Sequence, residues 1–304
     1  MEKKYTVPNG LTETLKKKLV ENGDRDFDRR MDVLAEQILS HPELRFIGLT
    51  GPTCSGKTTA ANKLCEILAE HSKRLHVISI DDFYYNKEYL HRLAIKNGRE
   101  ELDYDSEETI DVEKLQACVE SLLLGKETQL PHFNFHTGTR ENGKILKPME
   151  SDLFMFEGIQ VLYPSVARIL SLAHCQTVYI APMTSIEVNG VLFEAHEIRF
   201  LRRLVRDFRF RNTSPLFTFQ IWQSVRANEE AHIFPYIGHC DYFVDSTMPG
   251  EVGILKPYLT ELLEGVPKDA PFAKACEDIL KALSGVEDIS DQYLSEKSLY
   301  KEFI

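Results

Sequence analysis

The sequence lacks the long apolar runs of membrane-spanning and secreted proteins. No stretch approaches eighteen consecutive apolar residues, and the start, Met1-Glu2-Lys3-Lys4, has no signal-peptide segment. We therefore expect a cytoplasmic protein with no membrane span and no membrane partner.

Positive charge and paired cysteines are also scarce. The chain has 36 Lys and Arg against 47 Asp and Glu, a net charge of −11. A general nucleic-acid-binding protein carries a basic face, so we expect no nucleic-acid partner. The six cysteines are scattered and form no C-x-x-C pair, which indicates free thiols rather than a disulfide frame or a zinc site.

The chain has 304 residues, of which 43% are hydrophobic, enough to form a substantial core. A chain of this length is expected to form one large domain, or one domain with appendages. We predict an N-terminal helical extension over 1–44, a main domain over 45–265 and a C-terminal helical tail over 266–304. In the extension, two short helices (11–19 and 31–39) are expected on either side of a polar stretch. Residues 285–304 should be a polar tail with a short apolar end.

The central motif is Gly51-Pro52-Thr53-Cys54-Ser55-Gly56-Lys57-Thr58, which fits the phosphate-binding pattern G-x-x-x-x-G-K-[ST]. A short apolar run, typical of a buried strand, precedes the motif, and a stretch whose apolar residues recur with the period of a helix follows it. Phosphate binding by this loop requires that order of strand, loop and helix. Backbone N–H groups and the helix N-terminus would bind phosphate, Lys57 would reach the β- and γ-phosphates, and Thr58 would offer a hydroxyl to Mg²⁺. The predicted nucleotide-binding residues are Gly51, Pro52, Thr53, Cys54, Ser55, Gly56, Lys57, Thr58 and Thr59.

Further apolar runs predict buried strands, and two of them, 75–80 and 153–156, are followed directly by an acidic residue. The predicted strands are 45–50, 75–80, 153–156, 177–181 and 242–245. Ligands of an open parallel sheet lie beyond the carboxyl ends of its strands. We therefore favour Asp81 over Asp82 as the acceptor of a hydroxyl proton and Glu157 as a residue that orders Mg²⁺. Alternation of strands and helices predicts a three-layer α/β fold with a parallel sheet.

A helix predicted over 196–211 is rich in arginine. Its arginines at 199, 202, 203, 206 and 209 share one face, and apolar residues, among them Phe208, occupy the other. Such a stripe repels itself unless it meets an anion. The expected anion is the transferring phosphoryl group, with the helix acting as a lid.

A hairpin or pocket wall is predicted around 130–144, where aromatic and polar residues alternate. Asn142-Gly143 is a preferred type I′ pair, so we expect the turn there.

The set of motifs resembles the uridine kinase branch of the phosphoribulokinase/uridine kinase family, from about Ile47 to Leu259. Its pieces are 51–59, 79–84, 103–105, 131–140, 156–158 and 202–207. The resemblance implies a P-loop kinase fold. It also implies transfer of phosphate from ATP or GTP, with Mg²⁺, to the 5′-hydroxyl of a nucleoside.

The resemblance also implies residue roles. Asp81 would be the catalytic base, Lys57 and Arg206 would face the phosphates, and Thr58, Asp81 and Glu157 would surround the metal. The substrate-binding positions would be Tyr84, Tyr104, Asp105, Phe133, Arg140 and Arg203. Typical uridine kinases have a histidine at the position of Gly138 and often a tyrosine at that of Phe133. Because this sequence lacks both, the identity of the nucleobase in the substrate is left open.

Other functions remain open. The acceptor could be a sugar phosphate, pantothenate or glycerate, although the aromatic residues favour a flat base. The chain could also be a P-loop regulator that is not a kinase, but the guanine-reading N-K-x-D motif is absent: Asn86-Lys87-Glu88-Tyr89 has the wrong fourth residue. A homo-oligomer is left open.

Overall fold

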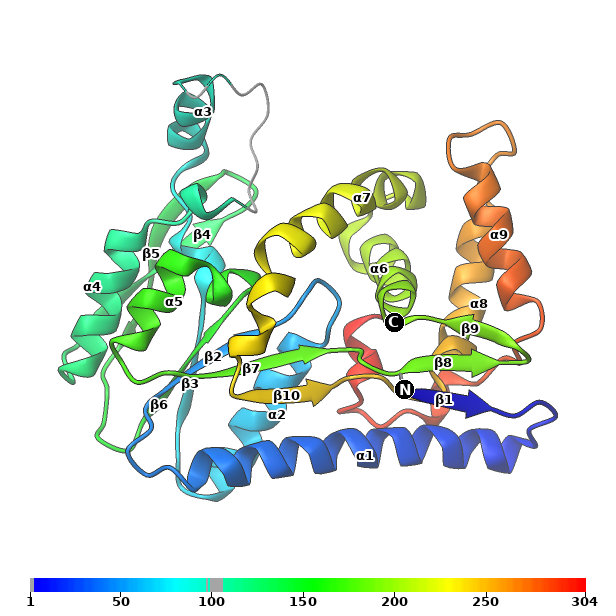
Figure 1. Ribbon diagram of the computed structural model, residues 1–304, viewed down its shortest axis with the longest axis horizontal. Coiled ribbons are helices and arrows are strands. Elements are labelled where there is room, and N and C mark those ends of the chain that lie inside the picture. The colour runs from blue at the N-terminus through cyan, green and yellow to red at the C-terminus, as the bar shows by residue number, and fades with distance from the viewer. Residues whose placement is uncertain (1–2, 97, 99–105) are drawn as a thin grey trace.

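A five-stranded parallel sheet forms the centre of the computed structural model, which describes residues 3–96, 98 and 106–304 (Figure 1). Its order is β10-β7-β2-β6-β3. The strands are β2 (Phe46–Thr50), β3 (Leu75–Ser79), β6 (Leu153–Glu157), β7 (Gln176–Ala181) and β10 (Tyr242–Asp245). β2 and β6 are almost wholly buried, because helices cover both faces of the sheet. The predicted three-layer α/β fold is confirmed, and each predicted strand is present.

Alternating side chains along the strands divide the core in two. Ile47 and Leu49 pack with α1 (Glu13–Leu39), α2 (Lys57–Glu70) and α8 (Glu251–Glu264) on one face. Phe46 packs with α4 (Val112–Leu123) and α5 (Pro164–Ser171) on the other.

The remaining helices are α3 (Lys87–Lys96), α6 (Ala195–Arg211), α7 (Pro215–His232) and α9 (Ala273–Leu283). None of the described helices is both long and apolar enough to span a membrane. All six cysteines are free, as predicted.

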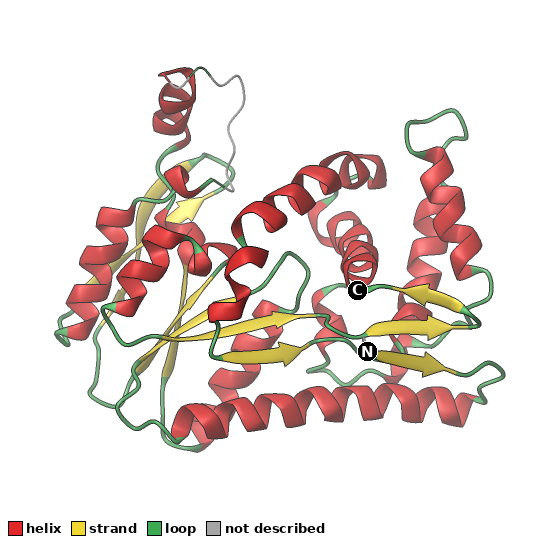
Figure 2. Ribbon diagram, viewed as in Figure 1, coloured by secondary structure: helices red, strands yellow, loops and turns green. Residues whose placement is uncertain are grey.

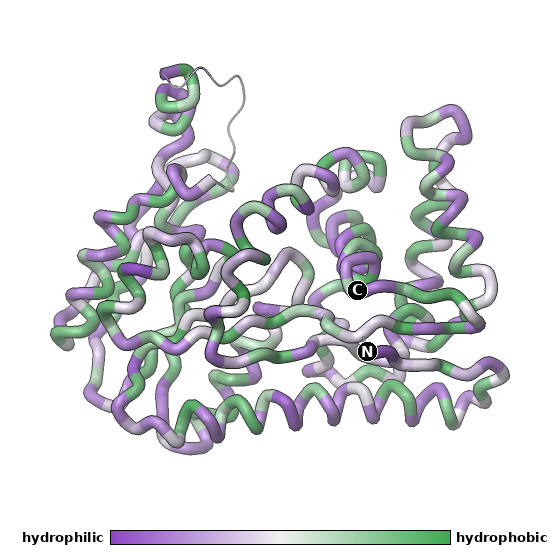
Figure 3. The backbone as a smooth tube through the Cα atoms, viewed as in Figure 1, coloured by the Kyte–Doolittle hydropathy of each residue, from purple (hydrophilic) through white to green (hydrophobic). Residues whose placement is uncertain are grey.

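The N-terminal segment holds one long helix, α1, so the prediction of two short helices was wrong. The polar stretch between them stays helical because one side of it packs inward: Gly23 and Asp24 are buried, and Asp24 accepts hydrogen bonds from Ser295 N (3.1 Å) and Ser298 Oγ (2.6 Å), while Glu21 and Arg25 are exposed. Hydrophobic and hydrophilic residues alternate along α1 in Figure 3. The apolar ones join the main core. The division of the chain at residue 44 stays a prediction.

We expect Met31→Ala to lower the free energy of unfolding by about 2 kcal/mol, since Met31 is only 1% exposed within the main core. Val33, two residues away on α1, is 48% exposed. Val33→Ala should therefore change the same free energy by less than about 0.5 kcal/mol. Urea unfolding of both variants checks this, and equal values would mean that α1 packs only loosely on the sheet.

The C-terminal residues are core rather than a polar tail, which corrects the expectation for 285–304. After α9 the chain forms two short 3₁₀ helices, Asp291–Tyr293 and Leu299–Glu302. The buried residues here are Val286, Ile289, Leu299, Tyr300, Phe303 and Ile304. These side chains lie near the two ends of the segment and join the main core, whereas Ser295, Glu296 and Lys297 between them are exposed.

A small second sheet was not predicted. It has the order β1-β8-β9 and consists of β1 (Lys4–Val7), β8 (Ser185–Val188) and β9 (Val191–Phe193). Asn189 and Gly190 join the last two strands, both with positive φ (52° and 76°), as a type I′ turn requires.

The predicted hairpin exists, but its turn was misplaced. Strands β4 (Thr128–Asn134) and β5 (Thr139–Leu146) pair as an antiparallel hairpin (Figure 2). Asn142 and Gly143 lie inside β5. The turn occupies 135–138, where Asn134 Oδ1 accepts from the N–H groups of His136 (3.0 Å) and Thr137 (3.3 Å). Gly138 then takes φ 68°. This asparagine-capped turn fixes the register and overrides the Asn-Gly preference.

Candidate active site

The phosphate-binding loop connects β2 to α2 as predicted. Lys57 lies at the first position of α2, and its Nζ donates to the carbonyl oxygens of Gly51 (2.9 Å) and Pro52 (3.3 Å). The amine therefore folds back over the loop. Two arginines of α6 hold the outer backbone: Arg199 Nη1 donates to Thr53 O (3.2 Å) and Arg202 Nη1 to Cys54 O (3.1 Å). The loop is thus fixed from both sides.

The arginines of α6 already have anionic partners within the chain. Arg199 forms a two-bond pair with Glu229 (2.7 Å each), and Arg202 Nη2 donates to Glu251 at 2.9 Å, both pairs being buried. The expectation that the stripe meets only a phosphoryl group is therefore wrong for Arg199 and Arg202. No local sequence pattern marked their partners, because Glu229 and Glu251 lie 30 and 49 residues downstream.

The other arginines also differ from the expected lid face. Arg203 Nε and Arg206 Nη2 share the carboxylate of Asp207, at 3.1 and 2.7 Å. Arg209 lies over the ring of Tyr258. Phe208, expected on the apolar face, is 50% exposed, because this end of α6 extends beyond the core. Arg206 is half-buried near the phosphate-binding loop; burial by itself lowers the pKa of its guanidinium, but neighbouring groups, Asp207 among them, raise it above its usual value.

Two acidic residues converge on Lys57 at the carboxyl ends of neighbouring strands. Asp81 follows β3, and Glu157 ends β6, where it is in register with Ser79 of β3 and Leu49 of β2. Burial raises the pKa of both carboxyl groups, and the positive charge of Lys57 opposes that rise in both. Asp81 also raises the pKa of Glu157 by repulsion. The three side chains therefore form one interacting group.

The adjacent aspartates have different partners. Asp82 Oδ1 accepts from Phe133 N (3.0 Å) and contacts His132 Nδ1 (3.1 Å), so it ties the β4–β5 hairpin to the end of β3. Asp81 instead faces Gln160 and Lys57. This arrangement fits the preference for Asp81 over Asp82 as the base.

Sequence reasoning missed Gln160, which holds Asp81. Gln160 is 1% exposed in a short 3₁₀ helix (Ile159–Leu162) directly after Glu157 and Gly158. Its Nε2 donates to Asp81 Oδ1 (2.7 Å) and to the hydroxyl of Tyr84 (2.8 Å). The sequence did carry one signal for Gln160: it is a single polar residue within the apolar run 159–162.

The predicted substrate residues are only partly brought together. Tyr84 is buried and packs edge-on against Phe133, with ring centroids 5.5 Å apart. Arg140 Nη1 instead donates to Asp111 at 2.7 Å. Tyr104 and Asp105 lie outside the described residues.

The donors around Lys57 fit a magnesium ion. The described part of the chain contains no group of three or more His, Cys, Asp or Glu residues suited to a metal. Mg²⁺, however, commonly uses one or two carboxylates and completes its shell with water and substrate oxygens. Asp81 and Glu157 repel each other in a buried place, and Thr58 offers an exposed hydroxyl in the first turn of α2. A small hard cation would relieve that repulsion.

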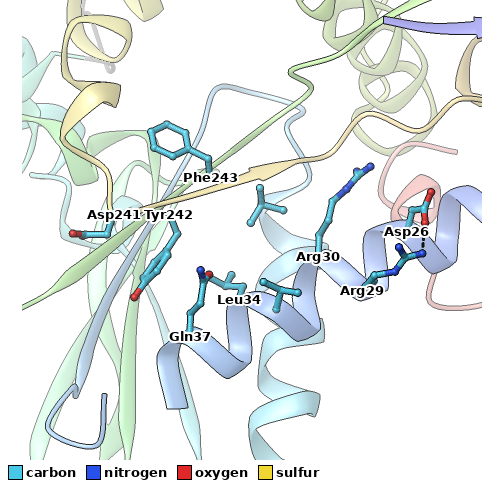
Figure 4. A pocket seen from close by; sticks show the side chains of 10 residues that line it. Asp26, Arg29, Arg30, Leu34, Gln37, Asp241, Tyr242 and Phe243 are labelled. Atoms are coloured by element: carbon cyan, nitrogen blue, oxygen red, sulfur yellow. Dashed lines mark hydrogen bonds and ion pairs between the residues drawn. The ribbon is translucent and has the colours of Figure 1, made fainter. Parts of the chain in front are cut away.

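Two cavities lie away from these acids. One of about 280 Å³ adjoins the phosphate-binding loop at Pro52, with Tyr179 and Arg226 in its wall. Another, of about 500 Å³, lies between α1 and β10, lined by Arg30, Tyr242 and others (Figure 4). No predicted site residue lines the second cavity, so it is not part of the candidate active site.

Comparisons with known proteins show which family and which proteins this chain resembles. A model of the Phosphoribulokinase / Uridine kinase family matches residues 46–249. A uridine kinase from Lactobacillus helveticus is 30% identical over 169 residues, which cover 55% of this chain and 70% of that protein. Uridine-cytidine kinase 2-B from Danio rerio is 27% identical over 127 residues, 40% of this chain and 48% of that protein.

Among solved structures, a protein from Silicibacter sp. TM1040, provisionally described as a fructose transport system kinase, has a TM-score of 0.52. It is 18% identical and aligns with 70% of this chain and 98% of its own. At this identity the likeness concerns the fold alone.

Proposed function

This chain belongs to the phosphoribulokinase/uridine kinase family and is a phosphotransferase that acts on a hydroxyl acceptor. On that premise we propose that it transfers the γ-phosphate of ATP or GTP to the 5′-hydroxyl of a nucleoside. The observation that carries the proposal is the convergence of Asp81 and Glu157 on Lys57 at the phosphate-binding loop. A proton acceptor and a phosphate-binding cation then flank the same space.

Asp81 would act as the general base. Gln160 holds one of its carboxylate oxygens. Burial raises its pKa, which makes it a stronger proton acceptor when ionised. The acceptor oxygen attacks the γ-phosphorus, its proton passes to Asp81, and the bond to the β–γ bridging oxygen breaks. Lys57 stabilises the charge on the phosphates.

Thr58, Asp81 and Glu157 would hold Mg²⁺, which when bound neutralises phosphate charge. Arg206 lies near the loop and would add positive charge at the transferring group, although Asp207, which it shares with Arg203, partly neutralises it in the present structure.

Tyr84 and Phe133 would form the wall of the nucleoside pocket. Both rings also contact Phe135 edge-on, with centroid distances of 6.2 Å from Tyr84 and 5.1 Å from Phe133. The three rings form an aromatic cluster beside Asp81. A flat nucleobase packs well on such a surface. Arg140 and Arg203 would have to exchange their present carboxylate partners to bind a sugar, and Tyr104 and Asp105 remain proposals from the family resemblance.

We expect Gln160→Leu to lower kcat about tenfold with little change in ATP affinity. The leucine fills a similar volume but cannot hold Asp81, so the base loses its orientation, and a misplaced catalytic group loses rate rather than binding. Gln160→Glu should not rescue the rate, because a carboxylate repels Asp81. Steady-state kinetics checks both variants. A higher KM for ATP at unchanged kcat would contradict the positioning role.

The proposed function is tested by a phosphate-transfer screen with ATP and GTP as donors. The acceptors should include nucleosides, 5′-deoxynucleosides and alcohols without a base, such as glycerate, pantothenate and sugar phosphates. We expect phosphorylation of at least one nucleoside and none of its 5′-deoxy analogue. Transfer only to an acceptor without a base would refute the nucleoside assignment.

A further inference from the structure

We propose that the chain carries its own competitor for the nucleotide: the carboxylate of Glu302 binds where a phosphate of the nucleotide must bind. Nucleotide binding then requires Glu302 to leave its place on α2. The inference rests on the proposed nucleotide-binding function of the loop at 51–59, and it adds a means of regulating that site.

The first evidence is a direct contact with the phosphate-binding helix. Glu302 Oε2 accepts hydrogen bonds from Thr59 N (3.1 Å) and Thr59 Oγ1 (2.8 Å). Thr59 is the third residue of α2, so its N–H is one of the groups at a helix N-terminus that have no acceptor within the helix. In phosphate-binding loops such N–H groups bind phosphate oxygens. A carboxylate of this chain therefore occupies a backbone N–H group that a phosphate would use, together with the hydroxyl of the same residue.

The second evidence is the charge that Glu302 brings to the site. Burial is the largest cause of the raised pKa of Glu157, and repulsion from the carboxylate of Glu302 adds to it. The same carboxylate is among the groups that hold the pKa of Arg206 above its usual value against the opposing effect of burial. Glu302 thus interacts with both the predicted metal ligand and the predicted lid arginine. A triphosphate that entered here would meet an additional negative charge.

The third evidence is the neighbour of Glu302 in the sequence. The ring of Phe303 lies under the guanidinium of Arg202, 4.8 Å from its centre, and Arg202 also donates to Cys54 O of the loop. Leu299 Cδ1 lies 2.4 Å from the position that a Cβ on Gly56 would take. The end of the chain is therefore pressed against the loop and α6, near the point marked C in Figure 1.

The segment is held by buried contacts that do not involve Glu302. Ser298 Oγ donates to Asp24 (2.6 Å), and the hydroxyl of Tyr300 donates to Met248 O (3.2 Å). Glu302 itself is only half-buried. Its side chain can therefore be replaced, or can rotate away, without opening the core around Ser298 and Tyr300.

The test measures binding by titration calorimetry without any acceptor and without Mg²⁺. The probes are ATP and inorganic tripolyphosphate, which has the phosphates but no base. Glu302→Gln removes the charge, and Glu302→Ala serves as a second variant. Glu296→Gln is the matched control, because Glu296 is exposed on the same segment. We expect both Glu302 variants to bind both probes about tenfold more tightly, the size of one charged contact at a helix N-terminus, and the control to match the wild type.

The outcomes separate this inference from the proposed function. If the wild type binds both probes and the Glu302 variants bind them equally or more weakly, Glu302 is a permanent cap of α2 and the inference is wrong. If no variant binds either probe, the loop does not bind nucleotide, and the proposed function falls together with the inference. Tighter binding by the Glu302 variants supports the inference even if the acceptor proves not to be a nucleoside.

Discussion

Asp81→Asn should lower kcat roughly 10²- to 10⁴-fold, the usual contribution of a general base. Asparagine keeps the size of the side chain and its hydrogen bond with Gln160 (2.7 Å in the wild type), but it cannot take the proton of the attacking hydroxyl. ATP affinity should change little, because Lys57 and the loop backbone provide the phosphate contacts. Steady-state kinetics with direct measurement of ATP binding separates the two quantities.

The neighbouring aspartate provides the control for this experiment. Asp82 binds the backbone of Phe133 and the ring of His132, so Asp82→Asn should weaken the attachment of the hairpin but leave most of kcat. Equal losses of kcat in the two variants would mean that position, not proton transfer, explains the effect. A collapse of ATP binding in Asp81→Asn would mean that Asp81 acts as a metal ligand and not as the base.

Glu251→Gln should destabilise the fold by roughly 4 kcal/mol, as expected when one member of a buried ion pair is removed. Glu251 and Arg202 are both fully buried. Although burial by itself lowers the pKa of Arg202, attraction to Glu251 raises it above its usual value. The variant therefore leaves a charged guanidinium in the core without a counter-ion. Guanidinium chloride unfolding gives the free-energy difference.

A surface pair is the control for this second experiment. Lys274 and Asp278 pair at 2.8 Å on α9 with both side chains exposed, so Asp278→Asn should not measurably change the free energy of unfolding. Because Arg202 also holds Cys54 O, Glu251→Gln should in addition weaken tripolyphosphate binding. A loss below about 1 kcal/mol would show that Arg202 finds another partner or water, contrary to the buried geometry.

Local sequence patterns were sufficient for the frame of the site. The apolar runs predicted all five central strands because a buried parallel strand needs a short continuous apolar stretch. The loop at 51–58 and the acids at the carboxyl ends of β3 and β6 could be placed because parallel strands put these ends at one edge of the sheet. Two local signals competed for the hairpin turn, the Asn142-Gly143 pair and the asparagine-capped turn at 135–138. The turn was predicted at the first and lies at the second.

Contacts between distant residues were decided only by the tertiary structure. Arg199 and Arg202 looked like a free cationic face, but Glu229 and Glu251 neutralise them. The length of α1 depends on the core that covers one of its sides, and the place of Glu302 depends on the packing of Phe303 beside α6. The sequence determined which chemical groups stand at the sheet edge, since strand period and motif spacing are local. Which charges are already paired depends on how far-separated segments pack, and no local pattern records that.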